Sequence, residues 1–239
     1  MTLPVAILAG GLASRLRPIT ESIPKALVPV AGSAFIEHQL ALLASQGYSR
    51  VVLCVGHLGE MIQAHLGDGA SRGMQIEYAF DGPQLLGTGG ALLRARPLLG
   101  DAFFVLYGDT YLPCDFRAVE QAFRDSLKPA LMTVLRNDDK WDTSNTVFSD
   151  GRVLRYDKHA RSPEMRYIDY GLGALKSDTL EGRPPHSPFD IGELYAKLAE
   201  QGELAGFQVH RRFYEIGSLQ GLADAETYLK DHSALRQCP

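Results

Sequence analysis

The sequence predicts an α/β protein in which a Rossmann-like, mostly parallel sheet is flanked by helices and carries a small antiparallel extension. In residues 1–136, short and entirely apolar runs of strand length alternate with segments of helical period, a pattern typical of parallel strands buried on both faces. In residues 137–239, the strand candidates are separated by turns, which favours antiparallel pairing. No linker separates the two parts, so we expect residues 1–239 to form a single domain with two lobes.

The first lobe shows the alternation most clearly. Strands are expected at residues 5–8, 51–55, 76–80, 103–106 and 130–135, and helices at 35–45, 58–66, 88–96 and 115–125. Gly47 follows the first of these helices, as glycine commonly does at helix ends. The helix at 88–96 is expected to stop at Pro97, because proline cannot donate the backbone hydrogen bond that continues a helix.

The second lobe has a different pattern. Short strands are expected at residues 146–148, 153–156 and 167–175, a hairpin-like segment at 204–214, and helices at 189–200 and 219–230. We expect the strands to extend the sheet of the first lobe and to form an antiparallel flap.

Composition limits the classes of partner. The chain is 45% hydrophobic and 22% charged with a net charge of −4, whereas proteins that bind duplex nucleic acid present a dense basic face. No apolar run is long enough to span a bilayer and no signal-peptide pattern is present, so we expect a cytoplasmic protein without a membrane partner. Cys54, Cys114 and Cys238 are scattered without metal-ligand spacing and are expected to be free thiols.

A loop after the first strand has the properties of a polyphosphate cradle. The apolar run ends at Gly10 and Gly11, and two adjacent glycines leave backbone amides open to an anion. Arg15, Arg17 and Lys25 then add positive charge around the same loop. A loop of this length in a compact domain is usually functional.

This loop resembles a known signature. The pattern L-A-G-G-x-x-x-R-L-x-P-x-T followed by P-K-x-L-V-P-V is similar to that of the sugar-1-phosphate nucleotidyltransferases, whose fold is GT-A-like. The resemblance implies that the turn Leu8, Ala9, Gly10 and Gly11 holds a nucleoside triphosphate. It also implies that Arg15 grips the departing pyrophosphate and that Lys25 bridges toward the phosphate under attack. Walker-type and GxGxxG dinucleotide motifs are missing from the sequence, which argues against those two classes.

A carboxylate follows the strand at 103–106. Gly108 and Asp109 lie where an open α/β sheet places its ligands, and a carboxylate beside a triphosphate would repel it without a divalent cation between them. Asp109 is therefore a candidate Mg²⁺ ligand, with a simple post-strand turn as the alternative. The resemblance implies a second ligand at Glu215, where the family motif has aspartate. Glu215 could instead supply a favourable charge at the start of the last helix.

A glycine-rich segment, Leu86 to Gly90, leads into the third helix. Its missing side chains would let the backbone lie flat against a base, and the resemblance implies that Gly87, Thr88 and Gly89 hold the base and ribose. A helix-capping role for Thr88 is the alternative. Gln84 could add an amide contact to the base.

The sugar side is less distinctive. Asn145, Lys158, Asp169 and Tyr170 fall where members of the family bind the sugar phosphate, and Lys158 resembles the lysine that contacts that phosphate. Each could equally be solvated surface. The resemblance thus divides the chain into a nucleotide-binding lobe, 1–136, and a lobe for the sugar phosphate with the C-terminal helix, 137–239.

The reaction implied is attack of a sugar 1-phosphate on the α-phosphorus of a nucleoside triphosphate, with Mg²⁺ as cofactor and release of pyrophosphate. The short chain most resembles bacterial heptose-1-phosphate guanylyltransferases, so GTP and a manno-heptose 1-phosphate are expected. N-acetylmuramate-1-phosphate uridylyltransferases are the nearest alternative. The oligomeric state is left open, with a homodimer as one alternative. Outside the family, a metal-dependent GT-A glycosyltransferase and a silent nucleotide-binding regulator remain as alternatives.

Overall fold

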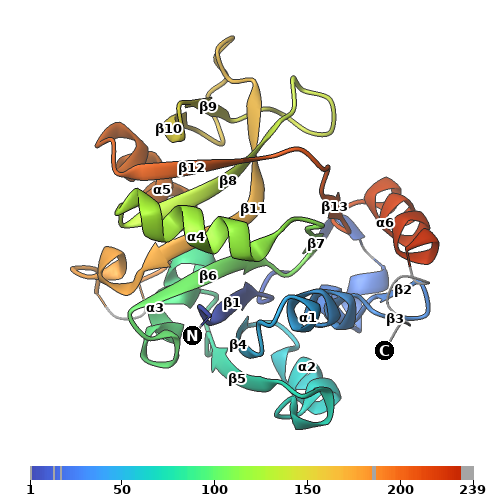
Figure 1. Ribbon diagram of the computed structural model, residues 1–239. Coiled ribbons are helices and arrows are strands. Elements are labelled where there is room, and N and C mark those ends of the chain that lie inside the picture. The colour runs from blue at the N-terminus through green and yellow to red at the C-terminus, as the bar shows by residue number, and fades with distance from the viewer. Residues whose placement is uncertain (1, 13, 17, 185–186, 233–239) are drawn as a thin grey trace.

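A nine-stranded mixed sheet organises the molecule, for which the computed structural model describes residues 2–12, 14–16, 18–184 and 187–232 (Figure 1). Its strand order is β5-β4-β1-β6-β11-β8-β12-β10-β9. These strands are β1 (Val5–Leu8), β4 (Arg50–Val55), β5 (Gln75–Phe80), β6 (Ala102–Tyr107), β8 (Ala130–Arg136), β9 (Thr146–Ser149), β10 (Arg152–Tyr156), β11 (Tyr167–Lys176) and β12 (Leu204–Val209). Expected strands of the first lobe recur within one residue at each end.

Helices cover both faces of this sheet. Apolar side chains of α1 (Phe35–Ser45), α2 (Gly59–Leu66) and α4 (Phe116–Ser126) belong to one core cluster, and those of α3 (Gly87–Leu99) and α5 (Ile191–Glu200) belong to a second. The side chains of β1 alternate between the two clusters, with Val5 and Ile7 in the first and Ala6 in the second. This period of two explains why the strands of the first lobe are apolar throughout.

One strand of the second lobe lies inside the sheet of the first. Strand β11 is inserted between β6 and β8 and runs antiparallel to both. Strands β10 and β11 run against the other strands of the sheet, which keep one direction. The predicted α/β sheet is confirmed in that most strands share one direction, but β11, which was expected in the antiparallel extension, lies inside the sheet and makes it mixed.

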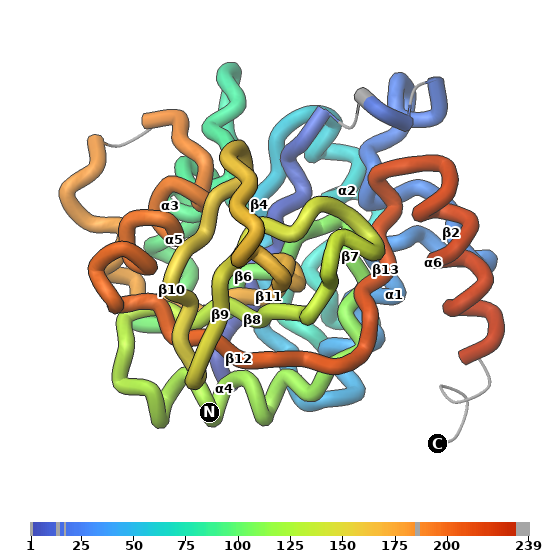
Figure 2. The backbone as a smooth tube through the Cα atoms, turned by 90° about the horizontal axis from the view of Figure 1, so that it is seen from above, coloured from blue at the N-terminus to red at the C-terminus, as the bar shows by residue number. Residues whose placement is uncertain are grey.

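A third core cluster packs together segments from the early, middle and late parts of the chain. Two short ribbons, β2 (Pro29–Val30) with β3 (Ser33–Ala34) and β7 (Thr110–Tyr111) with β13 (Tyr214–Glu215), pack with α6 (Leu219–Asp231). Figure 2 shows β7 and β13 side by side, next to α6. Five short 3-10 helices complete the described structure, at Ser14–Leu16, Ile19–Glu21, Lys25–Leu27, Ala70–Arg72 and Ser177–Leu180.

Two expectations are wrong, one about the end of a helix and one about strand pairing. The helix predicted to stop at Pro97 continues through it to Leu99. Leu99 is fully buried in the second core cluster, so packing holds a last turn that the sequence pattern disfavours. The segment at 204–214 is not a hairpin, because β12 pairs in parallel with β8 and β13 pairs with β7. No described helix is long and apolar enough to cross a membrane.

Candidate active site

Two cavities meet at the carboxyl end of β6. The first has a volume of about 260 Å³, the second about 640 Å³, and both are lined by Tyr107 and Asp109. Leu8 of β1 is paired with Tyr107 in the sheet, so the loops after these two parallel strands face the same space. Ligands in open α/β sheets bind at this edge.

The first cavity is bordered by most of the residues expected to hold a nucleotide. Of that set, Leu8, Ala9, Gly10, Gly11, Gly87, Thr88, Gly108, Lys25 and Asp109 line it. Gln84 and Gly89 do not line it: Gln84 is exposed, and Gly89 is buried. Cys54, Asp81, Leu85 and Ala91 line the cavity as well, although the sequence had not suggested them.

Glycines let the two strand ends approach closely. A Cβ atom on Gly108 would lie 2.7 Å from the backbone oxygen of Leu8, and one on Gly10 would lie 3.0 Å from the backbone nitrogen of Gly56. Side chains at these positions would push β1 away from its neighbours. A Cβ on Gly11, in contrast, would meet no described atom within 4 Å, so this part of the loop is open toward the cavity.

The glycines that follow Leu86 have a role different from the expected one. A Cβ on Gly89 would collide with the ring of Phe189, and one on Gly90 would lie 2.7 Å from the backbone oxygen of Ser187. Gly89 and Gly90 therefore let α3 pack against the segment before α5. The prediction that three glycines present a flat surface to a base needs correction, since among them Gly87 alone lines the cavity.

Thr88 also acts differently from a helix cap. Its Oγ1 accepts a hydrogen bond from the backbone N–H of Ile191 at 2.8 Å, and the N-cap residue of α3 is Leu86. Thr88 thus connects α3 to the start of α5 while it lines the first cavity.

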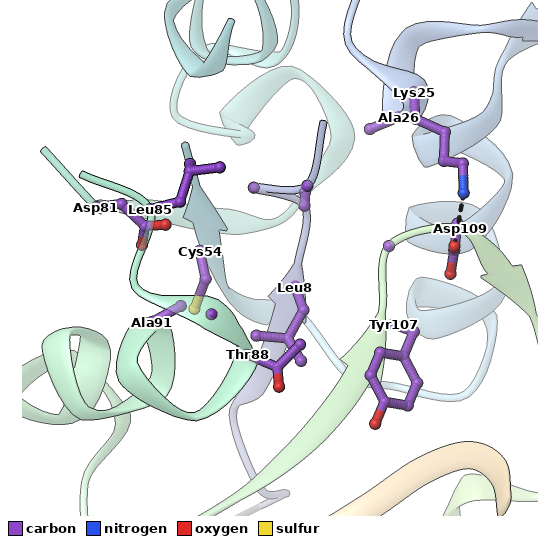
Figure 3. A pocket seen from close by; sticks show the side chains of 15 residues that line it. Leu8, Lys25, Ala26, Cys54, Asp81, Leu85, Thr88, Ala91, Tyr107 and Asp109 are labelled. Atoms are coloured by element: carbon purple, nitrogen blue, oxygen red, sulfur yellow. Dashed lines mark hydrogen bonds and ion pairs between the residues drawn. The ribbon is translucent and has the colours of Figure 1, made fainter. Parts of the chain in front are cut away.

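Lys25 and Asp109 form an ion pair at the junction of the cavities. The distance from Lys25 Nζ to Asp109 Oδ2 is 2.8 Å, and Figure 3 shows the pair at one end of the first cavity. Lys25 begins a short 3-10 helix (Lys25–Leu27), and Asp109 directly precedes β7. The cradle loop and the loop after β6 therefore bring opposite charges together across 84 residues of sequence. Arg17 lies outside the described residues.

Strand pairing brings Glu215 next to Asp109. Glu215 is paired with Thr110, and the backbone N–H of Ile216 donates to the backbone oxygen of Asp109 at 2.9 Å. The Glu215 carboxylate accepts hydrogen bonds from the Gly217 N–H and the Ser218 hydroxyl, and Ser218 caps α6. Both Asp109 and Glu215 line the second cavity.

This donor set fits a magnesium ion that shares its ligands with a substrate. Among the described residues, no group of three or more His, Cys, Asp or Glu side chains is placed to hold a metal by itself. Mg²⁺ is usually held by one or two carboxylates together with phosphate oxygens and water. Asp109 and Glu215, brought together by the β7–β13 pair, are the two carboxylates that such an ion would use.

The second cavity collects the residues expected on the sugar side. Asn145, Lys158 and Asp169 line it together with Asp109 and Glu215. Arg15, which was expected at the departing pyrophosphate, also lines this second cavity. Arg15 is exposed here and does not line the first cavity. Lys158 donates to Asp190 Oδ1 at 2.7 Å, which fixes the start of α5 to this cavity.

Tyr170 does not belong to this set. It is 1% exposed, packs edge-on against Phe213 and lies in the first core cluster. Neighbouring residues of a strand face opposite sides, so Asp169 of β11 faces the cavity and Tyr170 faces the core. The prediction that Tyr170 contacts the sugar phosphate is corrected for this reason.

Asp169 sits in a prepared polar environment. Asn145 Oδ1 accepts the Asp169 N–H at 3.0 Å, and Asp169 Oδ1 accepts the Gly171 N–H at 3.0 Å. Burial raises the pKa of Asp169 to about 6, against the opposing effects of the Gly171 hydrogen bond and the Lys158 charge. Tyr107 faces the same cavity with a buried hydroxyl for which the described residues provide no partner.

The comparisons with known proteins identify the family of this chain. The sequence model of the nucleotidyl transferase family matches residues 5–232, and the chain belongs to this family. A mannose-1-phosphate guanylyltransferase from Mycobacterium tuberculosis is 34% identical over 96% of this chain and 66% of its own length. An N-acetylmuramate alpha-1-phosphate uridylyltransferase from Caulobacter vibrioides is 29% identical over 94% and 96%.

The chain spans about half to two thirds of the length of its longer curated relatives. A UTP–glucose-1-phosphate uridylyltransferase from Synechocystis is 28% identical, and the match covers 82% of this chain and 55% of the relative.

The solved structure of HddC from Yersinia pseudotuberculosis complexed with GMP-PN has a TM-score of 0.81 and 24% identity, covering 96% of this chain and all of HddC. This likeness confirms the predicted α/β fold.

Proposed function

We propose that this protein is a sugar-1-phosphate nucleotidyltransferase, which joins a nucleoside triphosphate to a sugar 1-phosphate and releases pyrophosphate. The observation that carries the proposal is the meeting of two cavities at one carboxylate. Asp109 lines both of them, so two substrates bound in these cavities would meet beside it. A single-substrate binding protein has no need of the second cavity.

The residues at the junction suit the joining of two polyanions. Lys25 and Arg15 supply positive charge on either side of Asp109, where charge moves to the leaving pyrophosphate. The attacking phosphate oxygen is already anionic near neutral pH, so the chain needs no general base to activate it. Holding the oxygen and the α-phosphorus in line then supplies most of the rate enhancement.

Asp109 and Glu215 are the residues that would hold Mg²⁺. When bound, this ion neutralises phosphate charge and helps to orient the two substrates. Lys25 would then exchange its contact with Asp109 for one with the triphosphate.

We infer that the preferred substrates are GTP and a manno-heptose type of sugar 1-phosphate. The resemblance of residues 86–92 (LGTGGAL) and 108–111 (GDTY) to heptose guanylyltransferases motivates this choice. The guanylyltransferase from Mycobacterium tuberculosis, 34% identical over 96% of the chain, supports guanine. Asn145, Lys158 and Asp169 are the proposed contacts to the sugar phosphate.

A uridylyltransferase is the second candidate. The Caulobacter vibrioides relative acts on N-acetylmuramate 1-phosphate by its name, and its match covers nearly the whole of both chains. A GT-A glycosyltransferase would have no use for Lys25 and Arg15 at a departing pyrophosphate, and a silent regulator would show no turnover.

The deciding experiment is a matrix of substrates. Pyrophosphate release is measured with GTP, UTP, CTP, dTTP and ATP, each with mannose-, glucose-, heptose- and N-acetylmuramate-type 1-phosphates. We expect the highest kcat/KM with GTP and a manno-configured sugar. A maximum with UTP and N-acetylmuramate 1-phosphate would establish the second candidate, and no release in any pair would overturn the proposal.

A further inference from the structure

A buried carboxylate lies at one end of the first cavity. Asp81 follows β5 directly, lines the cavity and is 8% exposed. Its Oδ2 accepts the backbone N–H of Leu86 at 3.2 Å. Its Oδ1 is buried, and no described residue donates a hydrogen bond to it.

A buried carboxylate oxygen that has no hydrogen-bond donor among the described residues, such as Asp81 Oδ1, lowers the stability of the folded protein. A buried carboxylate oxygen without a donor loses its hydration and gains nothing in exchange. Burial accordingly raises the pKa of Asp81, while the Leu86 hydrogen bond and the Arg94 charge act in the opposite direction. Such an oxygen is typically satisfied by a ligand or an ordered water.

The surroundings of Asp81 suit a planar ring. Leu85, Cys54 and Ala91 lie around the carboxylate, whereas the Lys25–Asp109 pair lies at the other side of the cavity in Figure 3. Apolar walls favour a base, and the charged end favours phosphates. A nucleotide oriented in this way directs an edge of its base toward Asp81.

The chemistry of a carboxylate selects among the bases. Guanine carries two neighbouring donors, N1–H and N2–H, which match the two acceptor oxygens of a carboxylate. Uracil and thymine place one N–H between two carbonyl oxygens, which a carboxylate repels. Adenine and cytosine offer one amino group beside an unprotonated ring nitrogen.

We propose that Asp81 is the residue that selects guanine, by accepting hydrogen bonds from N1–H and N2–H of the bound base. This inference rests on the proposed function in one respect, namely that the first cavity is the nucleotide site. The Leu85 side chain lies beside Asp81 and is 38% exposed. A base that reaches the buried Oδ1 would have to displace this exposed side chain toward solvent.

The test is nucleotide binding measured by calorimetry, which requires no turnover. Inosine triphosphate lacks N2–H, so the wild type should bind it about 10-fold more weakly than GTP, the usual scale for one charge-assisted hydrogen bond. Asp81→Asn keeps the acceptor for Leu86 but replaces one acceptor with a donor. This variant should lose about 10-fold or more in GTP affinity and gain affinity for xanthosine triphosphate, whose C2 carbonyl accepts from the new amide.

Leu85→Ala is the matched control. It removes an apolar wall of the cavity and leaves the hydrogen-bonding pattern intact, so the affinities for GTP and inosine triphosphate should change by the same factor. Thermal unfolding of each variant shows whether the fold is retained. Equal binding of GTP and inosine triphosphate by the wild type, or unchanged GTP affinity in a folded Asp81→Asn, would overturn the assignment.

The experiments distinguish a failure of the Asp81 assignment from a failure of the proposed function. GTP binding with discrimination against inosine triphosphate, but no pyrophosphate release with any sugar 1-phosphate, supports Asp81 and removes the proposed function. Pyrophosphate release with UTP and no response to Asp81→Asn keeps nucleotidyl transfer and removes Asp81.

Discussion

Lys25 Nζ lies 2.8 Å from Asp109 Oδ2, so the cation of the cradle loop neutralises the carboxylate at the junction of the two cavities. The pair is partly exposed, with side-chain exposures of 17% for Lys25 and 37% for Asp109. A partly exposed pair of this kind contributes at most about 1 kcal/mol to folding. Its residues can therefore be replaced one at a time without unfolding the protein.

Asp109→Ala should abolish turnover and leave the fold intact. The variant removes a carboxylate that both cavities share, and the loss of such a group costs several kcal/mol of transition-state stabilisation, or roughly 100-fold or more in kcat. Pyrophosphate release and thermal unfolding measure the two effects. A near wild-type rate with Mg²⁺ present would contradict the assignment of Asp109.

Arg15→Ala and Lys25→Ala should lower kcat more than they raise KM for the triphosphate. Their charges matter most as pyrophosphate departs, when negative charge accumulates on the leaving group. Steady-state kinetics with the triphosphate varied at saturating sugar 1-phosphate separates the two constants. An effect on KM alone would mean that these side chains only attract the substrate.

Glu215→Asp should reduce activity although it restores the residue that the family motif has. The longer side chain reaches both the Gly217 N–H and the Ser218 hydroxyl, and a side chain shorter by one methylene cannot make both contacts from the same backbone position. Glu215→Gln keeps the length and removes the charge. If both variants keep full activity, the charge of Glu215 does not hold the metal.

Asp169→Asn should stabilise the protein at neutral pH and lose this advantage in acid. Because burial raises the folded-state pKa of Asp169 to about 6, the folded state binds more protons than the unfolded state between pH 4 and 6. The wild type thus loses stability as pH rises through that window. Each pKa unit corresponds to about 1.4 kcal/mol, and the partial exposure of Asp169 lowers the expected gain at pH 7 to about 1–2 kcal/mol.

Urea unfolding from pH 4 to pH 8 measures the stability difference between Asp169→Asn and the wild type, and a gain that does not vary with pH would contradict its origin in desolvation.

The neighbouring Tyr170→Phe serves as the control in kinetics. Its hydroxyl is buried without a described partner and faces the core, so KM for the sugar 1-phosphate should stay unchanged. In Asp169→Asn, the same KM should rise.

Local patterns were sufficient for much of the fold. The apolar pattern placed β1, α1 and β6 within one residue, because β1 and β6 are continuous apolar runs buried on both faces and α1 has an apolar stripe. The insertion of β11 between β6 and β8 could not be predicted, since the pairing of β11 with β6 joins residues that are far apart in the sequence and leaves no local trace. The persistence of α3 through Pro97 was missed because tertiary packing of Leu99 overrides helix propensity.

General rules of α/β structure are sufficient to find several residues of the candidate site. An acidic residue after a parallel strand pointed to Asp109, and the same rule applied to the strand at 76–80 would have found Asp81. Strand alternation would have separated Asp169 from Tyr170. No such rule indicated that Gly89 faces Phe189, because a glycine in the sequence does not reveal which neighbour requires its missing side chain.

The position of β11 in the sheet has a consequence for folding during translation. Strand β6 is synthesised long before Tyr167–Lys176, the strand that pairs with its second edge. Until then, the emerging chain carries an open strand edge with unpaired backbone groups, a template for aggregation. Residues 1–136 therefore cannot complete their sheet by themselves, because the strand that lies between β6 and β8 belongs to residues 137–239.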